Sequence, residues 1–322
     1  MLDDIRARLL RLFRAPDGSS TLAISGTGTS GMEAVVANLT APGARALVAV
    51  TGYFGDRLAQ MLGRYGAEVT RIDGEWGRAI DPSRVEQALS STKVDLVAVV
   101  HAETSTGVRN PVADIAALAR RYDALTIVDA VTSFGAMPLE IAAWGVDACY
   151  SCSQKGLGAP SGLAPVVFAP RALERRAQCR SFYLDLALLE DYWVRRKYHH
   201  TISAPLIYAL HEALAEVEDE GLEPRWARHE RTHQALVARL DGLGLSLLPP
   251  VTDRLWSLNA VRVPDGVSEA GVRAALLQKH GIEIGAGLGP LAGKIWRIGL
   301  MGSGSTTENV HLVADALTDA LK

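Results

Sequence analysis

The stretch ALTIVDAVTSFG, residues 124–135, decides how the chain is expected to fold. Its apolar part LTIV has the length and continuous hydrophobicity of a buried strand, and it ends at Asp129, where a glycine-bearing turn begins. In open α/β sheets the carboxyl ends of the strands form the ligand crevice. Asp129 is therefore expected at the edge of a sheet where ligands bind.

The next informative stretch is SCSQKGLGAPSG, residues 151–162, in which Lys155 carries the only charge. A loop lysine is ordinarily solvated, but nonpolar surroundings favour the neutral amine, which attacks carbonyl groups. Lys155 follows Asp129 by 26 residues. Pyridoxal phosphate needs such a pair, because a lysine binds its aldehyde as a Schiff base and a carboxylate keeps its pyridine nitrogen protonated.

Composition and charge exclude several classes of protein. The chain has 322 residues, 48% of them hydrophobic, and a net charge of -3. The length predicts two domains, and the charge indicates neither a nucleic acid nor an anionic membrane as partner. No apolar run is long enough to span a membrane, and the chain opens on a charged amphipathic helix rather than a signal peptide. Three cysteines favour a reducing, cytoplasmic location.

Predicted strands alternate with helices through the first two thirds of the chain, which indicates an α/β fold with a mostly parallel sheet flanked by helices. From 186 to 243 the pattern is helical, and the remainder reads as a small α+β unit with strands at 256–263 and 294–299 and helices at 268–279 and 306–321. We predict a large cofactor-binding domain, 1–220, and a small C-terminal domain, 221–322. The strands predicted for the large domain are 20–25, 45–50, 67–72, 94–100, 124–129, 146–151 and 163–168.

Residues 26–31, GTGTSG, match the dinucleotide-binding fingerprint. The acid that should end the next strand and bind a ribose is missing, because that strand ends in AVTGYFG. We therefore interpret the motif as a phosphate-binding turn, in which backbone amides and the hydroxyls of Thr27 and Thr29 lie at a helix N-terminus.

Two further motifs are interpreted as structural. HERTH, residues 229–233, has the spacing of a zinc-binding helix, but a third protein ligand is missing and the surrounding helix is expected to be solvated. CYSC, residues 149–152, has the spacing of a redox pair but lies at the end of a predicted strand, so both cysteines are expected in the core.

Other side chains leave two interpretations open. Glu103, in HAETSTG, is either a general acid or base or a carboxylate that stabilises a turn. Phe54 either stacks on an aromatic cofactor or belongs to the core. Arg297 lies in an apolar strand, where it either pairs with an internal carboxylate or binds the carboxylate of a ligand.

With these residues the sequence resembles the fold-type I pyridoxal phosphate enzymes, and among them the class V aminotransferases of the alanine-glyoxylate and serine-glyoxylate type. The resemblance runs from about residue 3 to the C-terminus, through SGTGTSGMEA, GYFGDR, HAETSTGV, VDAVTSFG, SQKGLGAPSG, YHHTISAPLIYAL and GLGPLAGKIWRIGLMG. Members usually begin with several tens of residues more, including a segment that lines the pocket, so a pocket open on one side is expected here.

The resemblance implies a role for each matching residue. Lys155 would bind the aldehyde of pyridoxal phosphate, Asp129 its ring nitrogen, and Arg297 the carboxylate of the substrate. Phe54 and Val131 would cover the two ring faces, and Thr104 would reach the ring hydroxyl. The residues implied to hold the phosphate are Thr27, Gly28, Thr29 and Gln154, with Tyr198 and Thr201 completing the site of the neighbouring subunit in a homodimer.

The expected function is the transfer of an amino group from alanine or serine to glyoxylate or pyruvate. Small partners are expected because no second arginine for a distal carboxylate is identifiable, with Arg109 and Arg180 as remaining candidates. Other class V enzymes stay open: a ureidoglycine-glyoxylate or aminoethylphosphonate transaminase, or a cysteine desulfurase or lyase using Cys179. A cofactor-binding but inactive homologue is the non-enzymatic alternative.

Overall fold

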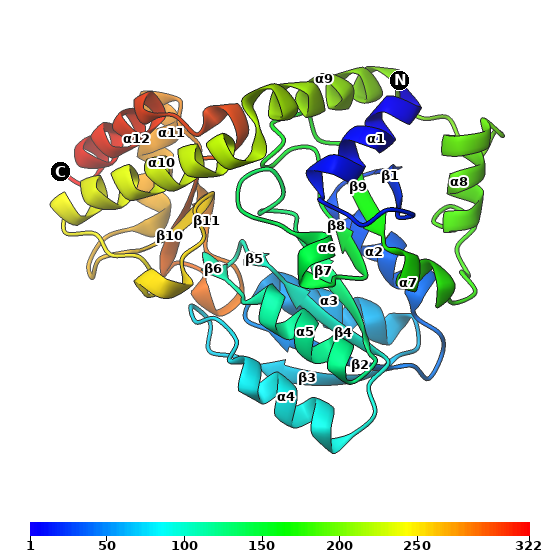
Figure 1. Cartoon of the computed structure of the whole chain (residues 1–322). Coiled ribbons are helices and arrows are strands. Elements are labelled where there is room, and N and C mark those ends of the chain that lie inside the picture. The colour runs from blue at the N-terminus through cyan, green and yellow to red at the C-terminus, as the bar shows by residue number, and fades with distance from the viewer.

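The short apolar runs form one large sheet in the computed structural model, which describes residues 1–322. The seven strands have the order β1-β9-β8-β7-β4-β2-β3 (Figure 1). Their bounds are β1 (Ser20–Ser25), β2 (Arg45–Val50), β3 (Glu68–Asp73), β4 (Leu96–Val100), β7 (Leu125–Asp129), β8 (Ala148–Tyr150) and β9 (Leu163–Phe168). The pairs from β3 to β8 are parallel, so the prediction of a mostly parallel sheet is confirmed.

The direction of β9 decides which strand ends meet. β9 runs antiparallel to both β8 and β1. Because two reversals restore the original direction, β1 points the same way as β8 and the other parallel strands. The carboxyl ends of β1, β2, β4, β7 and β8 therefore lie at one edge of the sheet.

Some predicted strands are longer than the observed ones. The strands predicted at 94–100 and 146–151 pair only over 96–100 and 148–150. Their apolar flanks Val94 and Val146 are buried in the core without joining the sheet, so hydrophobicity alone placed the ends too far out. Two hairpin strands, β5 (Ala102–Glu103) and β6 (Val108–Arg109), were not predicted, because two residues carry no readable alternation.

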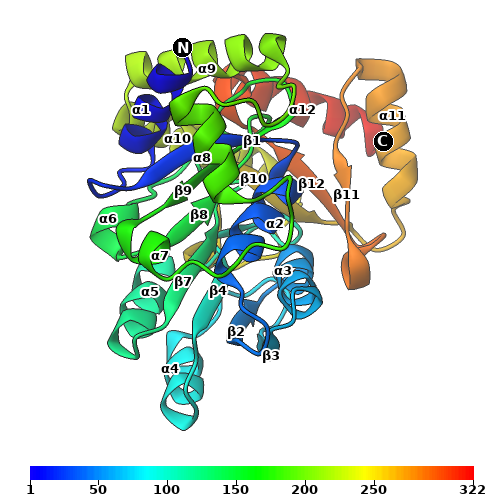
Figure 2. The same ribbon diagram turned by 90° about the vertical axis from the view of Figure 1, so that its right-hand side faces the viewer.

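Helices cover both faces of the large sheet. Figures 1 and 2 show α4 and α5 on one face and α2 and α3 on the other. The helices associated with the large sheet are α1 (Leu2–Leu12), α2 (Gly28–Leu39), α3 (Tyr53–Arg64), α4 (Pro82–Ser91), α5 (Val112–Arg121), α6 (Ile141–Trp144), α7 (Pro170–Glu174), α8 (Leu186–Arg195) and α9 (Ala204–Glu220).

The C-terminal part has a sheet and a core of its own, visible on one side of Figure 2. Its strands β10 (Leu258–Arg262), β12 (Ile295–Gly299) and β11 (Gly285–Ala286) pair antiparallel in that order. The helices α11 (Glu269–His280) and α12 (Thr307–Ala320) contribute to a separate cluster of 15 buried hydrophobic residues. The short 3-10 helices are η1 (Val251–Asp253), η2 (Gly289–Leu291) and η3 (Gly302–Gly304).

One long helix, α10 (Leu222–Gly242), joins the two cores. Leu222 and Trp226 near its start belong to the large core, whereas Leu236 and Leu240 near its end belong to the small one. Gly221, between α9 and α10, has a φ of 79°, a conformation that favours glycine. The domain boundary predicted near this residue stays a prediction.

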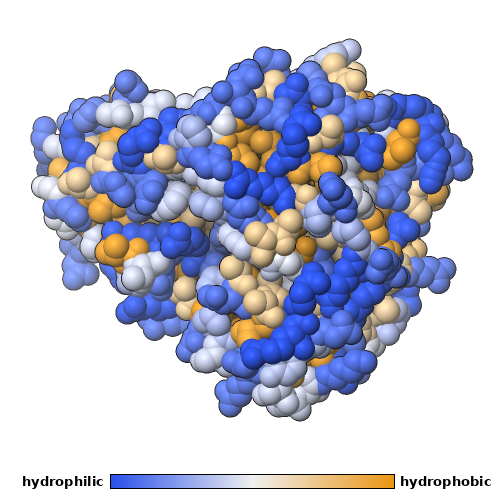
Figure 3. All heavy atoms as spheres, viewed as in Figure 1, coloured by the Kyte–Doolittle hydropathy of each residue, from blue (hydrophilic) through white to orange (hydrophobic).

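No helix combines the length and the apolar composition that crossing a bilayer requires. The face drawn in Figure 3 is largely hydrophilic, with hydrophobic residues in scattered groups.

Two neighbouring leucines of α11 provide a test of the small core. Leu276 is fully buried, whereas Leu277 is 53% exposed. We expect Leu276→Ala to lower the free energy of unfolding by about 2–5 kcal/mol, because it leaves a cavity. Leu277→Ala should change it by less than about 0.5 kcal/mol. Urea unfolding followed by fluorescence measures both, and equal effects would contradict the packing of α11.

Candidate active site

A cavity of about 300 Å³ opens at the carboxyl edge of the large sheet, beside the small sheet. All residues that the sequence predicts for the site, other than Tyr198 and Thr201, line it: Thr27, Gly28, Thr29, Phe54, Thr104, Asp129, Val131, Gln154, Lys155 and Arg297. They come from the ends of five strands of the large sheet and from β12. The structure brings these residues together, and their individual roles stay predictions.

Asp129 ends β7 and is buried, with an exposed fraction of 3%. Its Oδ1 accepts a hydrogen bond of 2.8 Å from the Val131 amide. Burial raises the pKa of the Asp129 carboxyl to about 7. Because the folded pKa lies above the ordinary carboxyl value, the stability from the protonated form is present at low pH and lost as pH rises through about 7. A cation bound beside Asp129 would return it to its charged form.

The start of α2 forms a second wall of the cavity. A Cβ atom on Gly28 would lie 2.7 Å from Cγ2 of Val131, so only glycine fits between α2 and this valine. The Thr29 hydroxyl accepts a hydrogen bond of 2.9 Å from Arg57. Gln154 Oε1 is buried and has no hydrogen-bond partner in the protein. Free amides at a helix start, hydroxyls and a guanidinium are together suited to a phosphate.

Glu103 has a structural role. Its carboxylate is completely buried and accepts hydrogen bonds from the Gly55 amide at 3.0 Å, the Phe54 amide at 3.4 Å and the Ser105 hydroxyl at 2.5 Å. It thereby satisfies free amides in the first turn of α3, where the helix dipole favours a negative charge. The interpretation as a turn-stabilising carboxylate is confirmed, and this contact also fixes the backbone that carries Phe54.

Arg297 lies on β12 and is partly buried. Its Nε donates to the carbonyl of Ala286 at 2.7 Å, and no carboxylate of the protein forms an ion pair with it. Burial lowers the pKa of its guanidinium, opposed by the charge of Glu103. Of the two interpretations, pairing with an internal carboxylate is wrong, and the free end of the guanidinium is available to a ligand.

Four further residues line the cavity and were not predicted from the sequence, namely Met32, Arg57, Val100 and Leu288. Arg57 was detectable in principle, because it follows Phe54 by three residues on α3 and therefore shares its helix face. Its guanidinium lies 5.2 Å from the Phe54 ring. The two arginines that the sequence left as candidates for binding a distal substrate carboxylate do not line this cavity. Arg180 is exposed, and Arg109 lines another cavity.

Tyr198 and Thr201 lie outside the cavity. Both are exposed, and the Tyr198 hydroxyl lies 3.3 Å from the Thr201 hydroxyl. Their predicted role in a neighbouring subunit is not a feature of the single chain, and it stays a prediction.

The cysteines do not take part in the cavity. Cys149 and Cys152 are free and buried, and burial raises the pKa of Cys152 to about 12, as expected of core residues. Burial also raises the pKa of Cys179, whose thiol donates to the Ser181 carbonyl. A thiol held in this way is a poor nucleophile.

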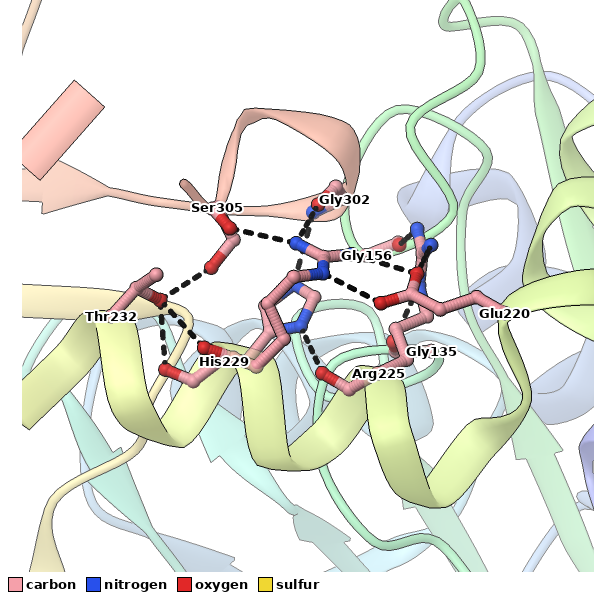
Figure 4. A network of polar contacts seen from close by, with 9 residues as sticks. Gly135, Gly156, Glu220, Arg225, His229, Thr232, Gly302 and Ser305 are labelled. Carbon is pink, nitrogen blue, oxygen red and sulfur yellow. Dashed lines mark hydrogen bonds and ion pairs between the residues drawn. The ribbon is translucent and has the colours of Figure 1, made fainter. Parts of the chain in front are cut away.

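Arg225 of α10 is hydrogen-bonded to Gly156, the residue that follows Lys155, and to Gly135 (Figure 4). Arg225 is buried and donates from Nε to the Gly135 carbonyl at 3.0 Å and from Nη2 to the Gly156 carbonyl at 2.8 Å. Its Nη1 pairs with Glu220 at 2.6 Å. Gly156 directly follows Lys155, so this arginine fixes the backbone next to the lysine.

The same face of α10 also holds the loop that begins at η3. Arg228 donates to the carbonyls of Gly302 and Ser305 at 2.9 and 2.7 Å, and the hydroxyls of Thr232 and Ser305 lie 2.6 Å apart (Figure 4). A Cβ atom on Gly302 would lie 3.0 Å from Gly158 Cα and 3.3 Å from the Lys155 carbonyl. The Lys155 turn therefore lies between α10 and a loop of the C-terminal part.

The HERTH motif belongs to this contact. His229 donates from Nδ1 to the Arg225 carbonyl at 2.8 Å and accepts from the Gly302 amide at 3.1 Å, and burial lowers its pKa to about 4. His233 is hydrogen-bonded to Asn259. The prediction of a solvated helix is wrong for this face, because long polar side chains can be buried once each has a partner. No group of three potential metal ligands is present.

The cavity fits pyridoxal phosphate by two observations on the protein. Asp129 is a buried carboxyl without a cationic partner, and Gly28 allows a close approach to the start of α2. A cationic ring nitrogen matches the first and a phosphate ester the second.

Comparisons with known proteins point in the same direction. A model of the family described as aminotransferase class-V matches residues 1–301. The chain is 38% identical to (S)-ureidoglycine–glyoxylate transaminase of Bacillus subtilis, over 92% of this chain and 77% of that protein. It is 35% identical to alanine–glyoxylate aminotransferase of Drosophila melanogaster, over 100% of this chain and 84% of that protein. A crystal structure of alanine–glyoxylate aminotransferase from Nostoc sp. has a TM-score of 0.96 and 44% identity, covering 100% of this chain and 86% of that one.

Arg225 provides a test of the contact between α10 and the Lys155 turn. We expect Arg225→Met to lower the free energy of unfolding by about 2–4 kcal/mol, because it leaves the buried carbonyls of Gly135 and Gly156 without a donor, whereas Glu220 keeps its ion pair with Arg228. Arg231→Met, at an exposed position of the same helix, is the matched control and should have little effect. Urea unfolding measures both, and equal stability of the two variants would mean that the contact does not hold the turn.

Proposed function

The chain belongs to the class V aminotransferase family and is a pyridoxal phosphate-dependent transaminase, and we propose that it transfers the amino group of alanine or serine to glyoxylate or pyruvate. The observation that carries the choice of small substrates is the guanidinium of Arg297, which forms no ion pair within the protein and lines a cavity of about 300 Å³. One carboxylate clamp suits an amino acid and a keto acid that each carry one carboxylate.

Arg57 is the other arginine of the cavity, and we assign it to the phosphate rather than to a second substrate carboxylate. Its hydrogen bond to Thr29 supports this assignment, because Thr29 lies in the turn predicted to bind the phosphate. A donor with two carboxylates would then find only Arg297 to receive them.

Transfer of the amino group from (S)-ureidoglycine to glyoxylate is the second candidate. The identity of 38% to the Bacillus subtilis transaminase supports it, and the alanine–glyoxylate relatives support the first candidate at a similar level. The two candidates share the acceptor and differ in the donor, so a comparison of donors separates them.

Bound pyridoxal phosphate supplies an aldehyde that accepts amino groups and a ring that withdraws electrons from the substrate Cα. On the side of the protein, Asp129 would hold a proton at the ring nitrogen, and its burial makes that contact strong. Arg297 would orient the substrate through its carboxylate. The Nζ of Lys155 would act as general base and acid, moving a proton between the substrate Cα and the cofactor.

We further propose a homodimer with shared active sites and a cytoplasmic location. Tyr198 and Thr201 support the first point, because two exposed hydroxyls outside the cavity of their own chain are available to a second copy. Free cysteines without a disulfide support the second.

The function is tested on protein purified with pyridoxal phosphate. We expect an absorbance band of the lysine-bound cofactor that bleaches on addition of L-alanine or L-serine and returns with glyoxylate or pyruvate. Lys155→Ala should lose the band and the activity, whereas Lys294→Ala, at an exposed position, should keep both. A band that persists in Lys155→Ala would overturn the assignment of this lysine, and a normal band that never bleaches would indicate an inactive homologue.

Arg297→Gln tests the carboxylate clamp. Loss of a charge-assisted hydrogen bond of about 1.5–3 kcal/mol should lower kcat/KM for the amino acid by roughly 10- to 100-fold, mainly through KM. The cofactor band should be unchanged. Arg262→Gln, at an exposed position of β10 in the same sheet, is the control. An unchanged KM in Arg297→Gln would show that the substrate carboxylate binds elsewhere.

A further inference from the structure

A second cavity, of about 390 Å³, adjoins the end of β4. Val100 lines the active cavity, whereas the next residue, His101, lines this one. Its other walls are the start of α5, Trp144 of α6 and the 3-10 helix η1. None of the roles described for the transaminase site uses this cavity.

The cavity contains an unpaired cation. Arg109, on β6, is half-buried and has neither an ion pair nor a hydrogen bond, and its guanidinium lies 6.0 Å from the ring of Trp256. Glu230 and Asp241 line the adjoining cavity that Arg109 also borders, and neither forms an ion pair with it.

The start of α5 adds to the positive potential. Val112 and Ala113 line the cavity, and the N-cap residue Pro111 provides no side-chain cap for the first turn. The positive end of the α5 dipole therefore borders the same cavity as Arg109, an arrangement that suits a carboxylate.

The same cavity contains the carboxylate of Asp253, which has unused hydrogen-bond acceptor sites. Asp253 accepts one hydrogen bond of 2.9 Å from the Ala79 amide and one of 2.8 Å from the Thr252 hydroxyl. A carboxylate has about four acceptor sites, so two remain. Asp253 and Arg109 do not pair with each other although they line one cavity.

Apart from Arg109 and Asp253, the residues that line the cavity are apolar or neutral. His101 is 3% exposed, neither of its ring nitrogens has a hydrogen bond, and its ring meets Trp144 edge-on at 5.4 Å. Burial lowers its pKa to about 3, so the ring is neutral. Met137 and Pro138 complete this wall.

We propose that this second cavity binds a free α-amino acid with an apolar side chain, at a site separate from the active site. The α-carboxylate lies at Arg109 and the start of α5, the ammonium group at Asp253, and the side chain against Trp144 and Met137. An isolated cation or an isolated anion would select a simple ion. The presence of both, unpaired, in one cavity selects a zwitterion.

L-Phenylalanine is the probe, titrated calorimetrically into the holoenzyme without a keto acid while the cofactor band is recorded. We expect saturable binding that leaves the band unbleached. Arg109→Gln should weaken it at least about 10-fold, the effect of one charge-assisted hydrogen bond. Arg121→Gln, an exposed arginine of α5 paired with Glu86, is the matched control and should bind as the wild type does. Arg297→Gln should also leave the affinity unchanged.

Two analogues test the two charges. L-Phenylalaninamide lacks the carboxylate and N-acetyl-L-phenylalanine lacks the ammonium group, so both should bind more weakly than L-phenylalanine. Asp253→Asn should weaken the binding of L-phenylalanine, while that of N-acetyl-L-phenylalanine changes little. A normal cofactor band and thermal midpoint show that each variant is folded.

Three results would overturn the proposal. One is the absence of binding up to roughly 10 mM, above the range of weak ligands. Another is unchanged affinity in Arg109→Gln. The third is loss of binding in Arg297→Gln together with bleaching in the wild type, which would place the amino acid in the active site alone.

Discussion

The three guanidinium nitrogens of Arg225 connect helix α10 to the turn that carries Lys155 and to the loop at Gly135. This side chain is almost completely buried and is bonded to two carbonyls and to Glu220. Desolvation lowers the pKa of its guanidinium, so the ion is stable there only because each face finds an acceptor. The bond to Gly156 constrains the backbone next to Lys155, and the adjacent bonds of Arg228 bring in the η3 loop. The position of the lysine thus depends on α10, a helix that also joins the two cores.

The second constraint is the topology of the sheet. The cavity collects side chains from β1, β2, β4, β7 and β8 because the reversal at β9 returns β1 to the direction of its neighbours. A β1 of opposite direction would place Thr27 and Thr29 at the far edge. The small sheet contributes Arg297 from outside this arrangement, so the site needs both sheets.

The sequence predicted the parts that depend on local pattern. Buried strands are recognisable by continuous hydrophobicity, and polar residues directly after them, such as Asp129, fall at one edge by topology alone. Lys155 was recognisable as a candidate site residue because the sequence around it carries no other charge. The buried face of α10 was not, because Arg225 and His229 are polar by residue type and are buried only through partners distant in the sequence. Two-residue strands such as β11 were missed for a related reason, since their pairing is fixed by β12 and not by their own residues.

Pairing, more than burial, separates the residues available to ligands from those that hold the fold. Glu103 and Asp129 are both buried carboxyls, and burial raises the pKa of each. Glu103 is bonded to amides of α3 and to Ser105, whereas Asp129 has the amide of Val131 as its backbone donor.

The same distinction applies to the buried Arg225 and the partly buried Arg297, since Arg225 donates hydrogen bonds from all three of its nitrogens and Arg297 only from Nε. A ligand gains little binding free energy at a charge that the protein already pairs completely, because the ligand would only replace an existing partner. Asp129 and Arg297 are the members of each pair whose desolvation the fold compensates only in part. A ligand that supplied a cation to the first and a carboxylate to the second would recover that cost, and this would favour binding at the carboxyl edge of the sheet.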